Sequence, residues 1–147
     1  VIINDEPILL VHAGFSLRKL FPESKVFPDI WPKYKTEKIP HGFGPQDDMT
    51  MTWIRKGWYN TEETLPVKVI CGHTPTNLLQ EMAHDTQDRC KRMNMPIPEW
   101  SKTVPNAKIW HYKNKINIDC GCAYGGNLAA LRLDDFKEFY VEGLKKE

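Results

Sequence analysis

Residues 67–75 read V-K-V-I-C-G-H-T-P, a run of β-branched and apolar residues that ends in glycine, histidine and proline. A short apolar run bounded by turn residues predicts a buried β-strand followed by a loop. Residues 8–14 read I-L-L-V-H-A-G, follow Pro7 and show the same order of strand, histidine and glycine. Their unbroken apolar character is typical of a strand that is covered on both faces. The two stretches therefore predict two buried strands, each with a histidine directly after it.

The remainder of the chain completes the prediction of an α/β fold. Residues 108–119 alternate in polarity around Lys113-Asn114 and predict a β-hairpin, because asparagine tolerates the left-handed backbone of a tight turn. Residues 128–142 predict a second hairpin, so the C-terminal third is predicted to be an antiparallel meander. Helical spacing favours helices over Asp47–Tyr59 and Leu78–Arg92. Five prolines exclude a long helix from residues 22–45.

The composition is that of a globular protein without a strong charge imbalance. Hydrophobic residues make up 41% and charged residues 27%, and the net charge is 20 − 19 = +1. This balance gives no support for a nucleic-acid binder driven by bulk charge or for a polybasic membrane patch. The longest apolar stretch, Ile8–Phe15, is too short to span a bilayer. We therefore expect neither nucleic acid nor a membrane as a partner.

The four cysteines favour a reducing compartment. Cys71, Cys90, Cys120 and Cys122 are too few and too irregularly spaced for a secreted disulfide scaffold, so we expect a cytoplasmic protein. A zinc site built from three of these cysteines and His73 is an alternative, although their spacing matches no standard structural zinc pattern. That alternative predicts one tightly bound zinc whose removal unfolds the domain.

His12 and His73 are the first candidates for chemistry. In α/β sheets, ligands bind at the carboxyl ends of the strands, which is where both histidines are expected. A neighbouring glycine allows close backbone approach, and neutral imidazole is a common ligand for zinc, manganese and iron. The alternative interpretation is that each histidine is a half-buried, hydrogen-bonded residue at a strand end. Finding two in the same context favours a site.

Two further features are weaker on sequence alone. Arg55 lies on the face of the helix expected over residues 47–59, and guanidinium is the preferred partner of phosphate oxygens. The alternative is an ordinary solvated arginine. Residues 119–127, D-C-G-C-A-Y-G-G-N, hold three glycines and form either a plain turn or a loop that closely approaches a ligand.

Taken in order, these segments form a pattern that resembles one family. The segments are V-H-A-G at 11–14, W-I-R at 53–55, G-H-T-P-T at 72–76, I-D-C-G at 118–121 and Y-G-G-N-L-A-A-L at 124–131. The pattern resembles the C-terminal half of a calcineurin-like metallophosphoesterase, nearest to the bacterial serine/threonine-phosphatase-like and diadenosine-tetraphosphatase-like branch. The matches run from about residue 8 to residue 135 and cover most of the chain.

The resemblance implies a fold, a cofactor and a reaction. The fold would be part of a four-layer α/β/β/α sandwich, and the cofactor would be two divalent metal ions, Mn, Fe or Zn. His12 and His73 match the family histidines that bind the second metal. Arg55 falls near the place of the substrate phosphate, and Tyr124 lies in the loop that borders the active site. The implied function is metal-dependent hydrolysis of a phosphomonoester, a phosphoprotein or a dinucleoside polyphosphate.

The departures from the family pattern limit what these residues do alone. The motifs G-D-x-H-G, G-D-x-x-D-R-G and G-N-H-E, which carry the other ligands and the general acid, do not occur and normally lie upstream of V-H-A-G. Cys120 also replaces a commoner threonine. We therefore expect residues 1–147 to be the C-terminal part of a single metallophosphoesterase domain, inactive alone, and assign no catalytic residue within them. The alternative is a non-catalytic binding or regulatory module that retains the fold.

Overall fold

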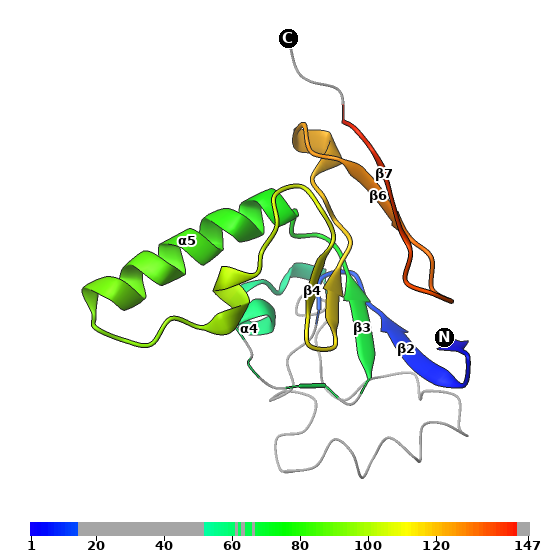
Figure 1. Cartoon of the computed structure of the whole chain (residues 1–147), viewed down its shortest axis with the longest axis horizontal. Helices are drawn as coiled ribbons and strands as arrows, with labels where there is room; N and C mark the ends of the chain where they lie inside the picture. The colour runs from blue at the N-terminus through cyan, green and yellow to red at the C-terminus, as the bar shows by residue number, and fades with distance from the viewer. Residues whose placement is uncertain (15–51, 61, 63, 66, 144–147) are drawn as a thin grey trace.

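The structure is a computed structural model that describes residues 1–14, 52–60, 62, 64, 65 and 67–143 (Figure 1). Its strands and helices occur in this order: β1 Ile2–Ile3, β2 Glu6–Leu10, α4 Lys56–Tyr59, β3 Lys68–Cys71, α5 Thr76–Arg92, the 3₁₀ turn η1 Glu99–Lys102, β4 Trp110–Tyr112, β5 Lys115–Asn117, the 3₁₀ turn η2 Cys122–Tyr124, β6 Leu128–Leu131 and β7 Glu138–Val141. The described part of the chain is a mixed α/β structure, as the sequence predicts. Within it, no helix is both long enough and apolar enough to cross a membrane.

The main sheet has five strands in the order β1-β2-β3-β5-β4. Strands β2, β3 and β5 run parallel, with Ile8 opposite Lys68 and Ile70 opposite Ile116, whereas β1 and β4 are antiparallel edge strands. Both apolar runs that the sequence singles out are thus confirmed as neighbouring parallel strands. Parallel neighbours end on the same edge of a sheet, so the segments after β2 and β3 are brought together.

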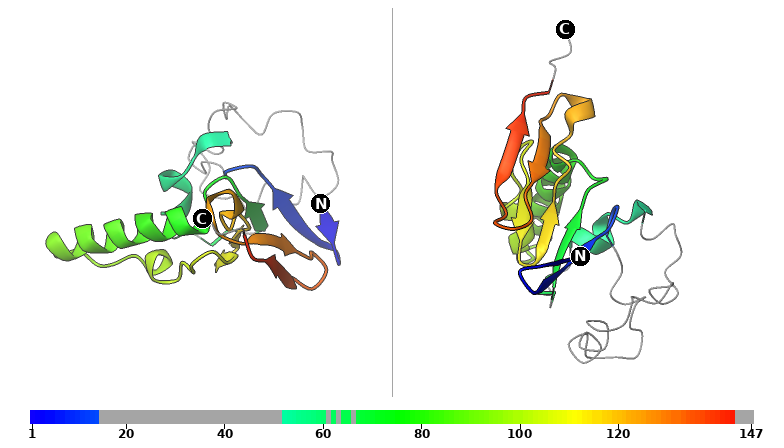
Figure 2. Two further views of the ribbon diagram at one scale, coloured as in Figure 1. Left: turned by 90° about the horizontal axis from the view of Figure 1, so that it is seen from above. Right: turned by 90° about the vertical axis from the view of Figure 1, so that its right-hand side faces the viewer.

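Both faces of this sheet are covered. Val69 and Cys71 of β3 belong to a core that includes Leu79 of α5 and Trp58 of α4, whereas Ile70 belongs to a second core on the opposite face. Tyr140 of β7 and other side chains of the β6–β7 hairpin pack against this second core. In the left view of Figure 2, α4 and the hairpin lie on opposite sides of the sheet. Coverage on both faces is thus found for β3, whereas in β2, the strand for which it was expected, Ile8 is buried but Leu10 is 52% exposed.

Both predicted hairpins form, but they do not make one meander. Strands β4 and β5 join the main sheet, and β6 and β7 form a separate two-stranded sheet. The chain leaves the first sheet through Gly121 and Gly125, whose φ angles of +75° and +82° bracket η2. These left-handed residues redirect the chain, so the second hairpin lies over the first sheet rather than extending it. The single antiparallel meander is therefore wrong.

The predicted helices are found in part. The helix expected over Leu78–Arg92 is α5, which begins two residues earlier at Thr76. Within the described residues, the helix expected over Asp47–Tyr59 is broken, because residues 52–53 and α4 are helical and Ile54 and Arg55 are not. The start of that expected helix and the proline-rich residues 22–45 lie outside the described residues.

Helix α4 is anchored to the sheet by Trp58. Its indole is 1% exposed, and its Nε1 donates a hydrogen bond to the Cys71 Sγ at 3.3 Å. The buried Lys115 Nζ donates to the Trp58 backbone carbonyl at 3.1 Å, which places a cation at the C-terminal end of this short helix. The backbone of Gly14 lies so close to the indole ring that a Cβ built there would be 2.6 Å from the Trp58 Cγ. These contacts fix the segment that carries Arg55.

Replacing Gly14 by alanine is expected to destabilise the protein by about 3 kcal/mol. The new methyl group would collide with the Trp58 ring, and the φ of +134° is a conformation that side chains disfavour. Urea unfolding measures the change. The matched control is Gly57→Ala in α4, where a Cβ meets nothing closer than 3.5 Å and alanine is the better helix former. Equal stability of Gly14→Ala and the unmodified protein would contradict this packing.

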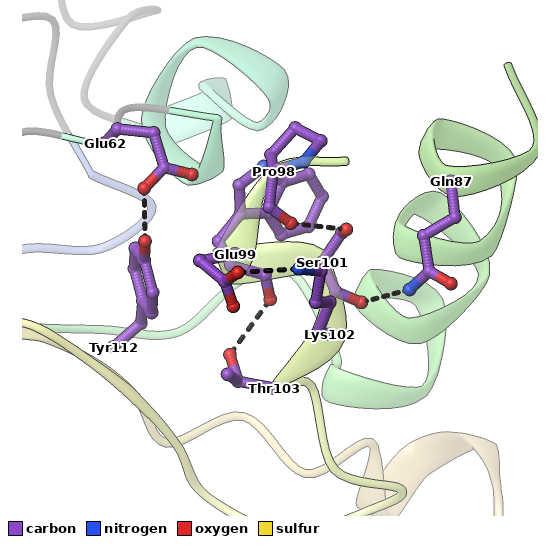
Figure 3. A network of polar contacts seen from close by, with 9 residues as sticks. Glu62, Gln87, Pro98, Glu99, Ser101, Lys102, Thr103 and Tyr112 are labelled. Atoms are coloured by element: carbon purple, nitrogen blue, oxygen red, sulfur yellow. Dashed lines mark hydrogen bonds and ion pairs between the residues drawn. The ribbon is translucent and has the colours of Figure 1, made fainter. Parts of the chain in front are cut away.

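A polar network ties η1 to the elements around it (Figure 3). The Gln87 side chain of α5 donates to the Ser101 carbonyl, and the Ser101 hydroxyl donates to the Pro98 carbonyl at 2.7 Å. On the other side, the Glu62 carboxylate accepts hydrogen bonds from the Tyr112 hydroxyl and from Lys113 at 3.4 Å. The return loop after α5 is thereby held against the helix, and Glu62 is held against the end of β4.

Glu62 is expected to make folding sensitive to acid. The hydrogen bond from Tyr112, followed by those from Lys113 and a backbone N–H, lowers the pKa of the Glu62 carboxyl below its usual value. Its charged form therefore stabilises the fold fully above the unfolded pKa, and this contribution is lost as pH falls through the lowered folded pKa. Glu62→Gln is expected to cost about 1 kcal/mol at pH 7 and to flatten the acid limb of the stability curve. Glu81→Gln, an exposed α5 residue, is the control; identical pH curves for both variants would contradict this role.

Candidate functional site

The two histidines meet at the carboxyl ends of β2 and β3. The Val11 N–H donates to the Ile70 carbonyl at 3.0 Å, and the Gly72 N–H donates to the His12 carbonyl at 2.8 Å. These backbone bonds extend the parallel ladder beyond the strands and set the two imidazoles side by side. His12 Nε2 lies 3.0 Å from His73 Nδ1, and the ring centroids are 4.8 Å apart. The expectation that each histidine follows an apolar strand is confirmed, and the structure adds that the two strands are neighbours.

The backbone at His73 is strained. Its φ is +68°, and the Thr74 N–H donates to the Gly72 carbonyl at 2.7 Å across a three-residue turn. A γ-turn with a left-handed central residue is rare and costs free energy when that residue has a side chain. Strain of this kind persists only where the surrounding structure enforces it, and it turns the imidazole of His73 toward His12.

The surroundings of His73 favour its neutral form. Burial lowers the pKa of the His73 imidazole below its usual value, and the nearby Arg55 and His12 lower it further. The carboxylate of Asp119 acts in the opposite direction and raises the pKa, but its effect is the smallest. Neutral imidazole has a free nitrogen lone pair, which is the form that coordinates a metal ion.

Arg55 and Trp53 complete the same site from the segment before α4. The Trp53 ring lies edge-on to the His73 ring, with centroids 5.1 Å apart, and the Arg55 Cζ lies 6.0 Å from the Trp53 ring centroid. Arg55 Nε and His73 Nε2 are both buried, and neither has a hydrogen-bond partner among the described residues. A buried nitrogen without a partner is costly, so each of these two donors, which both border the Trp53 ring, indicates a place for an acceptor.

The structure does not join Tyr124 to this group. Tyr124 ends η2 and is 72% exposed. Among the described residues, no hydrogen bond or ring contact links its side chain to His12, His73 or Arg55. Of the four residues singled out from the sequence, His12, His73 and Arg55 are linked by contacts or charge among the described residues, and Tyr124 is an exposed residue without such a link.

Asp119 is a residue of this site that sequence reasoning did not single out as a ligand or substrate contact. Its Cβ lies 3.6 Å from the position of a Cβ on Gly72, and its Oδ1 accepts the Gly121 N–H at 3.0 Å. The sequence signal was its position two residues beyond β5, the third parallel strand of the sheet. The hairpin pattern of residues 108–119 does not indicate that β5 pairs with β3, and this pairing is what brings Asp119 close to Gly72.

The spacing of the two facing imidazole nitrogens can be compared with that of metal ligands. His12 Nε2 and His73 Nδ1 lie within hydrogen-bond distance of each other, and their separation of 3.0 Å is also that of two nitrogen ligands bound at right angles about 2.1 Å from one ion. Among the residues that the structure describes, no group of three or more histidine, cysteine, aspartate or glutamate side chains is placed to hold an ion. The cysteine-based zinc site is therefore not assembled by Cys71, Cys120 and Cys122, and all the cysteines are free thiols.

Comparisons with family models, with curated proteins and with solved structures returned no match for this chain. The candidate site is therefore defined by its geometry: two facing imidazoles at the ends of parallel strands, and a guanidinium held close by.

Proposed function

We propose that the protein is a metal-dependent phosphohydrolase of the calcineurin-like metallophosphoesterase type. The observation that carries the proposal is the facing pair of His12 Nε2 and His73 Nδ1 at 3.0 Å, together with the buried and unpartnered His73 Nε2 and Arg55 Nε. The pair suits one divalent ion, Mn, Fe or Zn, in a site of two ions whose other ligands lie elsewhere in the complete protein. The proposed substrate is phosphorylated: a phosphomonoester, a phosphoprotein or a dinucleoside polyphosphate.

In this proposal each residue has a separate task. His12 and His73 hold an ion, and the bound ion supplies an activated water and stabilises negative charge on phosphoryl oxygens. With His73 Nδ1 used as a ligand, the ring proton resides on Nε2, which then donates a hydrogen bond to a phosphate oxygen. Arg55 donates from Nε to the same phosphate, and Trp53 packs beside both donors. A phosphate oxygen at this place gives both unpartnered donors an acceptor.

The finer fold assignment, a four-layer α/β/β/α sandwich, is part of the same proposal. The helices, the main sheet and the hairpin supply three layers in that order. The outer face of the hairpin is apolar and exposed, with Leu128, Ala130, Phe139 and Val141 in register across the two strands. A fourth layer packed on this face would bury it, which supports the assignment.

A second candidate is a non-catalytic binding or regulatory module that retains the fold. It is favoured by the finding that no third metal-ligating side chain joins His12 and His73 among the residues described. Such a module would bind a phosphorylated partner through Arg55 without hydrolysing it.

Hydrolysis of p-nitrophenyl phosphate by the full-length natural protein separates the two candidates. The phosphohydrolase is expected to turn over with Mn²⁺, to stop when EDTA removes the ion and to recover when Mn²⁺ is returned. Calorimetric titration with Mn²⁺ alone should show binding. Binding of inorganic phosphate without any metal-stimulated turnover would favour the module and contradict the proposed reaction.

A further inference from the structure

His73 needs an external restraint, and the end of β5 supplies one. A side chain at φ +68° lies in a strained backbone conformation, so the turn around His73 would relax unless neighbouring groups held it. The turn begins at Gly72, directly after β3, and is followed by α5. Because β5 is the parallel neighbour of β3, its last residue and the residues after it face this turn.

Asn117, the last residue of β5, uses both the nitrogen and the oxygen of its side-chain amide in hydrogen bonds near this turn. Its Nδ2 donates to the Thr74 carbonyl at 2.7 Å, and its Oδ1 accepts the Asp119 N–H at 3.1 Å. The Asp119 carbonyl in turn accepts the Thr76 N–H at 2.8 Å, so the turn is fastened at Thr74 and again at Thr76. Asn117 is 0% exposed, so water does not replace these bonds.

A buried asparagine is costly unless its amide is hydrogen-bonded, and here its partners are the carbonyl of Thr74, next to His73, and the N–H of Asp119. An apolar side chain at the end of β5 would suit the sheet but would leave the Thr74 carbonyl without its donor. The polar residue therefore serves the geometry of the turn and not the packing of the strand.

We propose that Asn117 is a positioning residue that holds the strained turn at His73 and so keeps His73 Nδ1 aimed at His12 Nε2. Asn117 does not touch a substrate or an ion; it acts through His73. The part of this inference that concerns ion affinity rests on the proposed metal site. The part that concerns the imidazole geometry does not, since the histidines face each other without an ion.

Two variants test the proposal in the full-length natural protein. Asn117→Ala removes the amide, and Asn117→Leu keeps its approximate size but lacks both the donor to Thr74 and the acceptor for Asp119. Ile116→Val, one residue earlier in β5 and facing the opposite core, is the control for general weakening of the strand. Nitrogen-15 spectra of the metal-free protein report the His12–His73 contact, calorimetry with Mn²⁺ reports ion affinity, and thermal unfolding reports stability.

In both Asn117 variants we expect the imidazole contact to be lost and Mn²⁺ affinity to fall by about 10–100-fold, the range for residues that orient metal ligands. In Ile116→Val both readouts should match the unmodified protein. An intact imidazole contact in a folded Asn117 variant would overturn the proposal. If the unmodified protein binds no Mn²⁺, the metal site fails, while the spectra of the metal-free variants still decide the role of Asn117.

A measurement on the unmodified protein covers the case in which neither variant folds. The Asn117 side-chain amide protons are expected to exchange with solvent far more slowly than those of the exposed Asn106, because the Thr74 carbonyl holds them in a buried bond. Equal exchange rates at Asn117 and Asn106 would overturn the proposal without any substitution.

Discussion

Removing either imidazole is expected to lower kcat/KM for p-nitrophenyl phosphate by at least about a thousandfold in the full-length natural protein, which corresponds to about 4 kcal/mol. The physical reason is that His12 and His73 face one another as a pair, so neither nitrogen can hold an ion tightly alone. The variants are His12→Ala and His73→Gly, assayed with saturating Mn²⁺. His84→Ala, an exposed histidine of α5, is the matched control and should keep full activity.

Glycine is chosen at position 73 because it separates chemistry from folding. The backbone there has φ +68°, which glycine adopts freely, so His73→Gly removes the imidazole and relieves the strain of the turn. Its stability is expected to stay within about 1 kcal/mol of the unmodified protein. A stable variant without turnover assigns His73 to the site. Unchanged turnover in both histidine variants would remove the pair from the mechanism.

Replacing Arg55 by alanine is expected to lower kcat/KM by about 100–1000-fold, the cost of losing one preorganised donor to a charged transition state. The buried Arg55 Nε has no hydrogen-bond partner among the described residues and lies in the electrostatic neighbourhood of His73. Arg55→Lys should recover only part of the loss, because an ammonium group lacks the planar fork of guanidinium. Competitive inhibition by inorganic phosphate should weaken in parallel.

Arg89→Ala is the control for a general change of charge, because Arg89 is an exposed residue near the end of α5. It should leave both turnover and phosphate inhibition unchanged. If Arg55→Ala retains full turnover, the two unpartnered nitrogens serve something other than phosphate. If it raises KM alone, Arg55 binds substrate and transition state equally.

The sequence predicts the strands and the long helix well because their signals are local. The apolar runs at 8–11 and 67–71 carry enough β-branched and apolar residues to define β2 and β3, and apolar spacing defines α5. The assignment of the two hairpins to different sheets was not predictable in this way. It depends on the left-handed backbone at Gly121 and Gly125, which redirects the chain. The alternation of polar and apolar residues within the strands carries no information about that change of direction.

The candidate site shows the same division between local and distant information. His12 and His73 stand out because each directly follows an apolar strand. Asn117 and Asp119 do not, because their importance comes from β5 lying beside β3, a pairing between distant parts of the chain. Tyr124 is indicated by the resemblance alone, and in the structure its side chain is exposed.

The parallel register of β2 and β3 also has a consequence for the order in which the protein folds. It pairs Ile8 with Lys68, residues far apart along the chain, whereas β4 and β5 are joined by a tight turn. Closing a long loop costs more chain entropy and is slower than forming a local hairpin. We therefore expect the hairpin and α5 to form early and β2 to dock late. Since His12 directly follows β2, the two imidazoles come together only as folding nears completion.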